Sequence, residues 1–252
     1  MKRGSKVRSI PFIQKFLQNP MYLIAIKMKK FLHYLRLSFF TLPLLAMQND
    51  KPLRVVFFGD SITQAGVGPK GYITQLRSML DSKGLGNQYE LMGAGIGGNK
   101  VYDLYLRMDD DVLAKKPDIV FVYIGINDVW HKQTHGTGTD LDKYVKFYEA
   151  IIKKLKDNNI RTILCTPSVI GERNDYSNEQ DGDLNRYARE IRQLASRHGL
   201  ALVDLRQEFQ NYLVNNNPKN EEKGILTSDR VHLTEAGNTF VAEKMMEVLL
   251  KK

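Results

Sequence analysis

The sequence predicts an α/β domain in which a parallel β-sheet is covered by helices on both faces. From residue 53 onward, short apolar runs alternate with longer stretches in which apolar residues recur at helical spacing. The runs at 55–58 and 119–124 are continuously apolar instead of alternating with polar residues, which is typical of strands buried on both faces. Strands that alternate with helices along a chain form parallel sheets with helices on both sides.

The same pattern places each element along the chain. Strands are expected at 54–58, 89–92, 119–124, 161–165 and 200–203. Helices are expected at 71–80, 101–115, 141–156, 183–198, 204–214 and 234–250. Pro117 follows the second of these helices and Gly199 follows the fourth, as helix-ending residues do. Because neither a repeat nor a low-complexity linker interrupts this region, one domain is expected over residues 52–252.

Positive charge is concentrated at the N-terminus. The formal net charge of the 252 residues is +9, but residues 1–50 hold nine lysines or arginines and one acid. The remainder, with 28 basic and 27 acidic residues, is close to neutral. The high pI is therefore weak evidence for nucleic-acid binding, and no nucleic-acid partner is expected. Cys165 is the only cysteine, so no intrachain disulfide can form and cysteine usage does not indicate the compartment.

Residues 1–51 are expected to be a targeting segment that precedes the domain. A basic stretch at 28–36 is followed by an uncharged stretch rich in Leu and Phe at 37–47. This stretch is shorter than the roughly 20 residues of a membrane span but fits the apolar region of a signal peptide, about 7–15 residues. We expect a signal peptide at 28–47, translation from Met28 or Met1, and a periplasmic or extracellular location. The alternative is an amphipathic helix that docks on the domain or on a membrane, and an uncleaved segment is the only membrane contact expected.

Residues suited to chemistry follow the predicted strands. Ser61 follows the first strand, Gly95 the second and Asn127 the third, while Asp229 and His232 precede the final helix. The carboxyl ends of parallel strands share one edge of the sheet, where ligands bind. We therefore expect these side chains to lie close together.

These residue types are the ones that a serine nucleophile needs. A serine requires a base, usually histidine, and the histidine requires an acid that fixes its tautomer, so Ser61, His232 and Asp229 form a candidate triad. The backbone N–H groups of Ser61 and Gly95 and the amide of Asn127 are candidate donors to an oxyanion. A glycine at position 95 allows backbone and substrate to approach closely.

Each of these residues also has a purely structural interpretation. Asp60 and Ser61 are common turn or N-cap residues, Asn127 is common in turns, and His232 stands where a surface or capping histidine is usual. For a lone motif this structural interpretation is the more frequent one, so a catalytic site is indicated only when all of these residues occur together.

Two other kinds of site are disfavoured. The glycines at 93, 95 and 98 resemble a phosphate-binding loop, but no acidic residue follows at the distance typical of a dinucleotide site. His131 and His135 are four residues apart, but they lie among glycine and threonine residues without a supporting carboxylate pattern, so no metal site is expected.

Taken together, the motifs resemble the SGNH/GDSL hydrolase family. Its four blocks occur in order, and the similarity spans about residues 53–250. The blocks are Gly59-Asp60-Ser61, Gly95, Gly125-Ile126-Asn127-Asp128, and Asp229-x-x-His232. The chain departs from the family at Gly93, where many members have asparagine two residues before the glycine of the second block.

The resemblance implies a flavodoxin-like fold, a three-layer αβα sandwich around a five-stranded parallel sheet of order 2-1-3-4-5. It implies hydrolysis of carboxylic esters through an acyl-serine at Ser61, with His232 and Asp229 as its partners. Gly95 and Asn127 are implied as oxyanion donors. It implies neither a metal nor an organic cofactor.

The function expected is that of an exported serine esterase. The sequence has no long apolar lid segment of the kind a long acyl chain would need, which favours short acyl groups such as acetyl, first of all on carbohydrate. The alternatives are a lysophospholipase or thioesterase, or a non-catalytic carbohydrate-binding module of the same fold. Trp130, the only tryptophan, is expected either to stack on a sugar or to pack in the core.

Overall fold

Five parallel strands form the centre of the domain in the computed structural model, which describes residues 21, 24, 28 and 51–251. The sheet order is β2-β1-β3-β4-β5, as predicted, so the expected fold class is confirmed. The strands are β1 (Leu53–Gly59), β2 (Tyr89–Gly95), β3 (Ile119–Tyr123), β4 (Arg161–Cys165) and β5 (Ala201–Val203).

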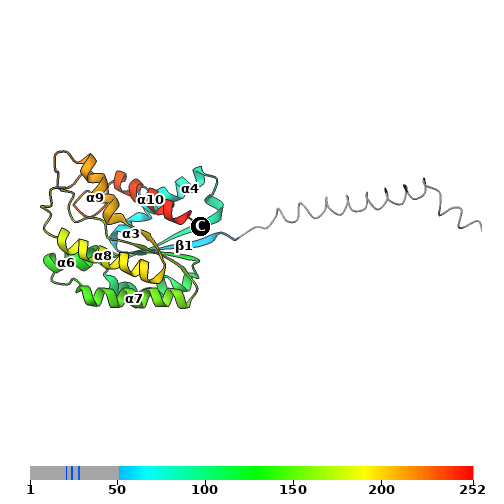
Figure 1. Ribbon diagram of the computed structural model, residues 1–252, viewed down its shortest axis with the longest axis horizontal. Coiled ribbons are helices and arrows are strands. Elements are labelled where there is room, and N and C mark those ends of the chain that lie inside the picture. Colours follow the sequence, from blue (N-terminus) through cyan, green and yellow to red (C-terminus); the bar gives the residue numbers. More distant parts are fainter. Residues whose placement is uncertain (1–20, 22–23, 25–27, 29–50, 252) are drawn as a thin grey trace, which may run out of the picture. The chain divides into compact units, whose positions relative to one another are not determined.

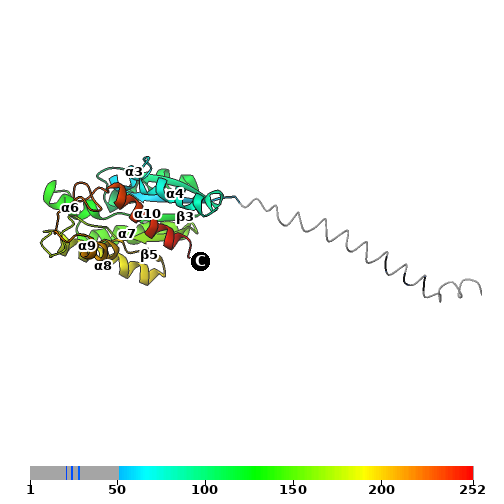
Figure 2. The same ribbon diagram turned by 90° about the horizontal axis from the view of Figure 1, so that it is seen from above.

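Helices cover both faces of this sheet. On one side α4 and α10 pack against each other. On the other side α7 packs between α5 and α8 (Figures 1 and 2). The long helices are α4 (Tyr72–Ser82), α5 (Val101–Asp111), α7 (Leu141–Asp157), α8 (Asp181–His198), α9 (Leu205–Asn216) and α10 (Glu235–Leu249). The helix predicted over 101–115 ends early, because a 3₁₀ turn (Leu113–Lys115) and a left-handed Lys116 follow it.

The central strands explain the continuous apolar runs. Residues 55–58 of β1 are fully buried, and every residue of β3 is buried as well. The two strands pair in parallel register with Phe57 opposite Phe121, and these two rings stack at 4.9 Å between centroids. Helices on both faces thus make an apolar side chain favourable at every position of the strand.

Two short helices at the carboxyl edge of the sheet were not among the elements predicted from the sequence. They are α3 (Ser61–Gly66), directly after β1, and α6 (Ile126–Thr134), directly after β3. Neither has enough turns to show a helical apolar period in the sequence. A third difference is that β2 continues to Gly95, which pairs with Gly59, where a glycine-rich loop was expected from residue 93. These differences place Ser61 and Asn127 in the first turns of helices.

The predicted targeting segment lies outside the described residues, apart from three isolated positions that include Met28. Within the described part of the chain, no helix combines the length and the apolar character that crossing a bilayer requires.

Candidate active site

Ser61, His232 and Asp229 form a continuous chain of hydrogen bonds. Ser61 is the first residue of α3, and its Oγ lies 2.9 Å from Nε2 of His232. Nδ1 of the same ring lies 2.6 Å from Oδ2 of Asp229. Because a carboxylate only accepts, Nδ1 carries the proton, which leaves Nε2 free to accept the Ser61 hydroxyl proton. The arrangement is that of a serine nucleophile, its base and an orienting acid.

The Asp229 carboxylate is fixed by its own loop, the Asp–His loop (residues 217–234) between α9 and α10. Its Oδ1 accepts the backbone N–H groups of Val231 at 3.1 Å and His232 at 2.8 Å. Partial burial raises the pKa of Asp229, but the hydrogen bonds from His232 and the loop backbone outweigh it and leave the pKa below its usual value. Asp229 is therefore ionised at neutral pH, as stabilising an imidazolium requires.

The start of α3 is built by Gly59 and Asp60. A Cβ at position 59 would lie 2.4 Å from the carbonyl oxygen of Tyr123, so only glycine fits at this strand end. Asp60 is buried and caps α3 by accepting the N–H of Ile62 at 3.0 Å. Burial raises the pKa of Asp60 to about 6, against smaller opposing effects of that hydrogen bond and of the charge on His232.

Gly95 is the point at which the backbone of α3 touches the end of β2. A Cβ there would lie 2.1 Å from the backbone nitrogen of Gln64 and 2.5 Å from the carbonyl carbon of Thr63. The following β2–α5 loop (residues 96–100) is tied to α3 as well, because the N–H of Gly97 donates to Oε1 of Gln64 at 2.8 Å. The sequence predicted that a glycine at position 95 allows a close approach to the backbone. In the structure, the group that approaches Gly95 closely is the backbone of α3.

Asn127 lies in the first turn of α6 and is 2% exposed. One of its two amide hydrogens is used, because Nδ2 donates to the carbonyl oxygen of Asn99 in the β2–α5 loop at 3.0 Å. A side-chain amide has a second hydrogen, which remains for another acceptor. The neighbouring Asp128 accepts the N–H of Val101 at 3.2 Å, and burial raises its pKa to about 7. Residues 127 and 128 thus join α6 to the β2–α5 loop and to α5.

Trp130 lies beside the candidate base. Its ring centroid is 6.3 Å from that of His232, with the planes at 71°, and the side chain is only partly buried. The sequence left open whether Trp130 packs or stacks on a sugar. The structure shows an edge-to-face contact with His232 and part of the ring exposed.

Glu172 was not singled out in the sequence, yet it organises the Asp–His loop. The side chain is fully buried in the segment between β4 and α8. Its carboxylate accepts the backbone N–H groups of Ile225 at 2.8 Å, Leu226 at 2.6 Å and Thr227 at 2.5 Å. These bonds fix the part of the loop that immediately precedes Ser228 and Asp229.

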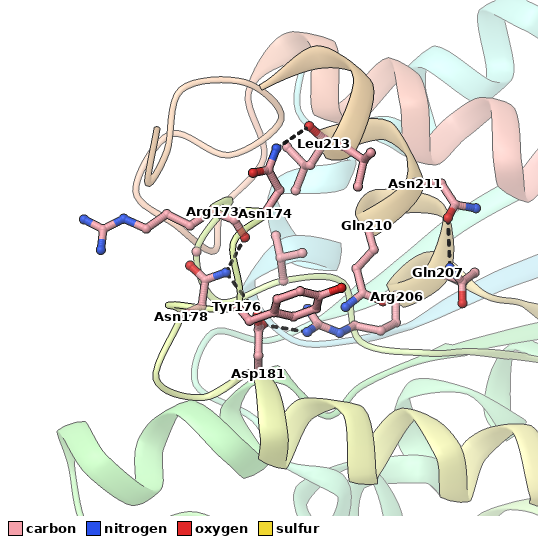
Figure 3. Close-up of a pocket in the computed structure, with 13 residues that line it drawn as sticks. Arg173, Asn174, Tyr176, Asn178, Asp181, Arg206, Gln207, Gln210, Asn211 and Leu213 are labelled. Atoms are coloured by element: carbon pink, nitrogen blue, oxygen red, sulfur yellow. Dashed lines mark hydrogen bonds and ion pairs between the residues drawn. The ribbon is translucent and has the colours of Figure 1, made fainter. Parts of the chain in front are cut away.

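A cavity of about 260 Å³ lies between the β4–α8 segment and α9, and its lining does not include Ser61, Asp229 or His232. Figure 3 shows Tyr176 and Asp181 beside the end of the Arg206 side chain, which extends from α9. Arg206 is 1% exposed and donates to Asp181 at 2.6 Å. Gly171 in the cavity wall donates to the carbonyl oxygen of Arg230 at 2.9 Å, so the cavity adjoins the Asp–His loop but is separate from the triad.

The fold and this geometry define a serine hydrolase of the α/β class. Residues 57–240 match the model of the GDSL-like Lipase/Acylhydrolase family. An acetylxylan esterase of Geobacillus stearothermophilus is 31% identical over 211 residues, which cover 77% of this chain and 92% of that protein. The chain therefore belongs to the GDSL-like lipase/acylhydrolase family and is a carboxylic ester hydrolase. The enzyme class expected from the sequence is therefore confirmed.

Solved structures show the same relationship. The acetyl xylan esterase AlAXEase is 59% identical with a TM-score of 0.78, over 79% of this chain and 100% of that one. Axe2, an acetylxylan esterase from Geobacillus stearothermophilus, is 27% identical with a TM-score of 0.70, over 82% of this chain and 98% of that one. Catalytic mutants of Axe2 replace a serine, an aspartate and a histidine by alanine, the last two being three positions apart in that protein.

Proposed function

We propose that this protein removes acetyl groups from acetylated xylan or its oligosaccharides. The observation that carries the proposal is the hydrogen-bonded chain from Ser61 through His232 to Asp229, at 2.9 and 2.6 Å. The substrate is supported by the similarity to AlAXEase and Axe2. The spacing of Asp229 and His232 equals that of the aspartate and histidine replaced in the catalytic mutants of Axe2.

Acylation begins when Ser61 Oγ attacks the acetyl carbonyl carbon and His232 Nε2 takes the hydroxyl proton. Asp229, already ionised, stabilises the imidazolium that forms. The oxyanion of the tetrahedral intermediate accepts hydrogen bonds from the N–H groups of Ser61 and Gly95 and from the free amide hydrogen of Asn127. The intermediate collapses as His232 returns the proton to the sugar oxygen, which leaves as an alcohol.

Deacylation repeats these steps with water. His232 removes a proton from a water molecule, whose oxygen attacks the carbonyl carbon of acetyl-Ser61. The second tetrahedral intermediate uses the same three donors. Its collapse breaks the bond to Ser61 Oγ, His232 returns the proton to that oxygen, and acetate is released.

The acyl specificity is tested by a chain-length series of p-nitrophenyl esters together with acetate release from acetylated xylooligosaccharides. The proposal predicts that kcat/KM is highest for the acetyl ester and falls steadily as the acyl chain lengthens, and that acetate is released from the oligosaccharide. A maximum at long acyl chains would indicate a lysophospholipase or thioesterase instead. Absence of acetate release from every acetylated saccharide would contradict the carbohydrate substrate.

Export through the N-terminal segment is also part of the proposal. It rests on the basic stretch at 28–36 and the uncharged stretch at 37–47. N-terminal sequencing of the protein recovered from its native host should give a mature start near Met47 or Gln48. An intact N-terminus in protein recovered from the cytosol would contradict export.

A further inference from the structure

The side chain of Arg107 spans the ends of two strands beside the candidate active site. It extends from α5 and is 15% exposed. Its Nη2 donates to the carbonyl oxygens of Gly59 at 2.8 Å and of Ala94 at 3.0 Å, the ends of β1 and β2. Its Nε donates to Oδ1 of Asn99 in the β2–α5 loop at 2.7 Å. One guanidinium thus joins three separate backbone segments.

Each of these three segments carries or holds one proposed oxyanion donor. Gly59 is two residues before Ser61, and Ala94 is directly before Gly95. Asn99 is the residue whose carbonyl oxygen accepts Nδ2 of Asn127 at 3.0 Å. Arg107 is therefore connected to all three donors. The N–H groups of Ser61 and Gly95 lie two residues and one residue after a carbonyl group that Arg107 binds, and the amide of Asn127 is one further hydrogen bond away.

The guanidinium is itself held in place. Its remaining nitrogen, Nη1, donates to Asp111 at 2.7 Å one helical turn further along α5. The guanidinium carbon lies 4.6 Å from the centroid of the Phe58 ring, a cation–π distance. Residue 93 of β2 does not help to hold these segments, because it is a glycine and has no side chain. A Cβ added there would lie 2.4 Å from Val67.

Only arginine can make this set of contacts. Its planar guanidinium presents N–H groups in fixed directions and remains charged, so it can serve Gly59, Ala94 and Asn99 together. A lysine at the same position has a single ammonium group and no planar fork. Lysine would preserve the charge but not the three-way connection.

We propose that Arg107 is a positioning residue that sets the relative placement of the three oxyanion donors. It does not touch the substrate; it acts through Gly59, Ala94 and Asn99. The inference rests on the proposed roles of Ser61, Gly95 and Asn127. Because oxyanion charge develops in the transition state, the loss of Arg107 should lower kcat and leave KM nearly unchanged.

The test is steady-state hydrolysis of p-nitrophenyl acetate by Arg107→Lys, with Arg77→Lys as the matched control. Arg77 extends from α4 and also donates to a carbonyl oxygen of β2, that of Leu91 at 2.8 Å, but it bonds to none of Gly59, Ala94 and Asn99. Arg107→Lys is expected to lower kcat about 100-fold, as misplacement of a site by about 1 Å does, with KM within about twofold. Arg77→Lys should keep the kcat of the unmutated protein.

A double-mutant cycle with Asn127→Ala separates positioning from general stability. If Arg107 acts through the oxyanion donors, Arg107→Lys should cost clearly less in the Asn127→Ala background than in the unmutated protein. Equal costs in both backgrounds, or a change in KM in place of kcat, would overturn the inference. The unmutated protein's own activity on this ester tests the proposed function separately.

Asn99→Ala provides a second route should Arg107→Lys fail to fold. It removes the side-chain acceptor of Arg107 and keeps the backbone carbonyl that holds Asn127. We expect kcat to fall about tenfold at unchanged KM, because a tenfold change in rate corresponds to about the free energy of one hydrogen bond. A kcat equal to that of the unmutated protein would overturn the inference.

Discussion

At the scale of single residues, the triad and its support differ in how visible they are in a sequence. Ser61 stands in a short motif at a strand end, and Asp229 and His232 stand in a short motif just before the final helix, so residue type and position predict that they meet. Arg107 and Glu172 stand in no motif. Their partners distant in sequence are backbone groups, at separations of 48 residues for Gly59 and 53 to 55 residues for 225–227. Every residue has such backbone groups, so no pattern of side chains in the sequence predicts the hydrogen bonds that Arg107 and Glu172 make to them.

Asn127 is the residue for which the catalytic and structural interpretations diverge most. Asn127→Ala should lower kcat by roughly 10²–10³, the effect of removing one oxyanion donor, with little change in KM. Asn127→Asp should be worse, because a carboxylate of nearly the same shape places negative charge beside the developing oxyanion. Both changes lose the bond to the Asn99 carbonyl, so a stability cost of about 1 kcal/mol is expected as well.

Kinetics of both Asn127 variants on p-nitrophenyl acetate, with melting temperatures measured in parallel, check this ordering. If Asn127→Asp had a kcat close to that of the unmutated protein, Asn127 would serve only as a structural link between α6 and the β2–α5 loop.

At the scale of elements, the long helices and all five strands follow from apolar periodicity, whereas the short elements that carry the site do not. The helices α3 and α6 were not predicted, because six and nine residues hold too little of a helical period to be recognised. The Asp–His loop contains no helix or strand, only an isolated antiparallel bridge between Thr227 and Leu233. Its conformation depends on the buried carboxylate of Glu172, which belongs to a different segment of the chain.

Glu172→Gln should disturb the Asp–His loop. An amide has one oxygen, so at least one of the three N–H groups at 225–227 loses its acceptor and faces an NH₂ group. Hydrogen bonds to charged groups contribute about 1.5–3 kcal/mol each, so the free energy of unfolding should fall by about 2 kcal/mol or more. Because the loop carries Asp229 and His232, kcat/KM should fall too.

The matched control is Glu179→Gln, an exposed glutamate in the same β4–α8 segment. Urea unfolding and ester hydrolysis of both variants test the role of Glu172. Equal stability and activity in the two variants would show that the loop holds its conformation without this carboxylate.

At the scale of the whole molecule, two buried carboxyl groups near the site should affect stability in the same direction. Burial raises the pKa of Asp60 to about 6 and that of Asp128 to about 7, from 3.8. The folded state therefore holds these protons more tightly than the unfolded state. Their contribution to stability is present at low pH and is lost as pH rises from about 4 to about 7.

Asp128→Asn should remove most of this dependence. Asparagine can still accept the N–H of Val101 through its carbonyl oxygen and carries no charge at any pH. Urea unfolding of the variant and the unmutated protein across this pH range should show that the variant gains relative stability as pH rises. Contributions from other groups, including Asp229, are common to both proteins and cancel in the difference. If the free energies of unfolding of the two proteins changed in parallel with pH, the pKa of Asp128 would not be raised in the folded protein.

Whether Ser61 is the nucleophile of this ester hydrolase is decided by the rate at which Ser61→Ala hydrolyses p-nitrophenyl acetate. Removing the nucleophile of a serine triad costs on the order of 10⁶ in kcat. We expect Ser61→Ala to lose several orders of magnitude in kcat at an unchanged melting temperature. Among the described residues Ser61 Oγ hydrogen-bonds to His232 alone, and Ser61 is not part of the buried core. Activity within tenfold of the unmutated protein would contradict it.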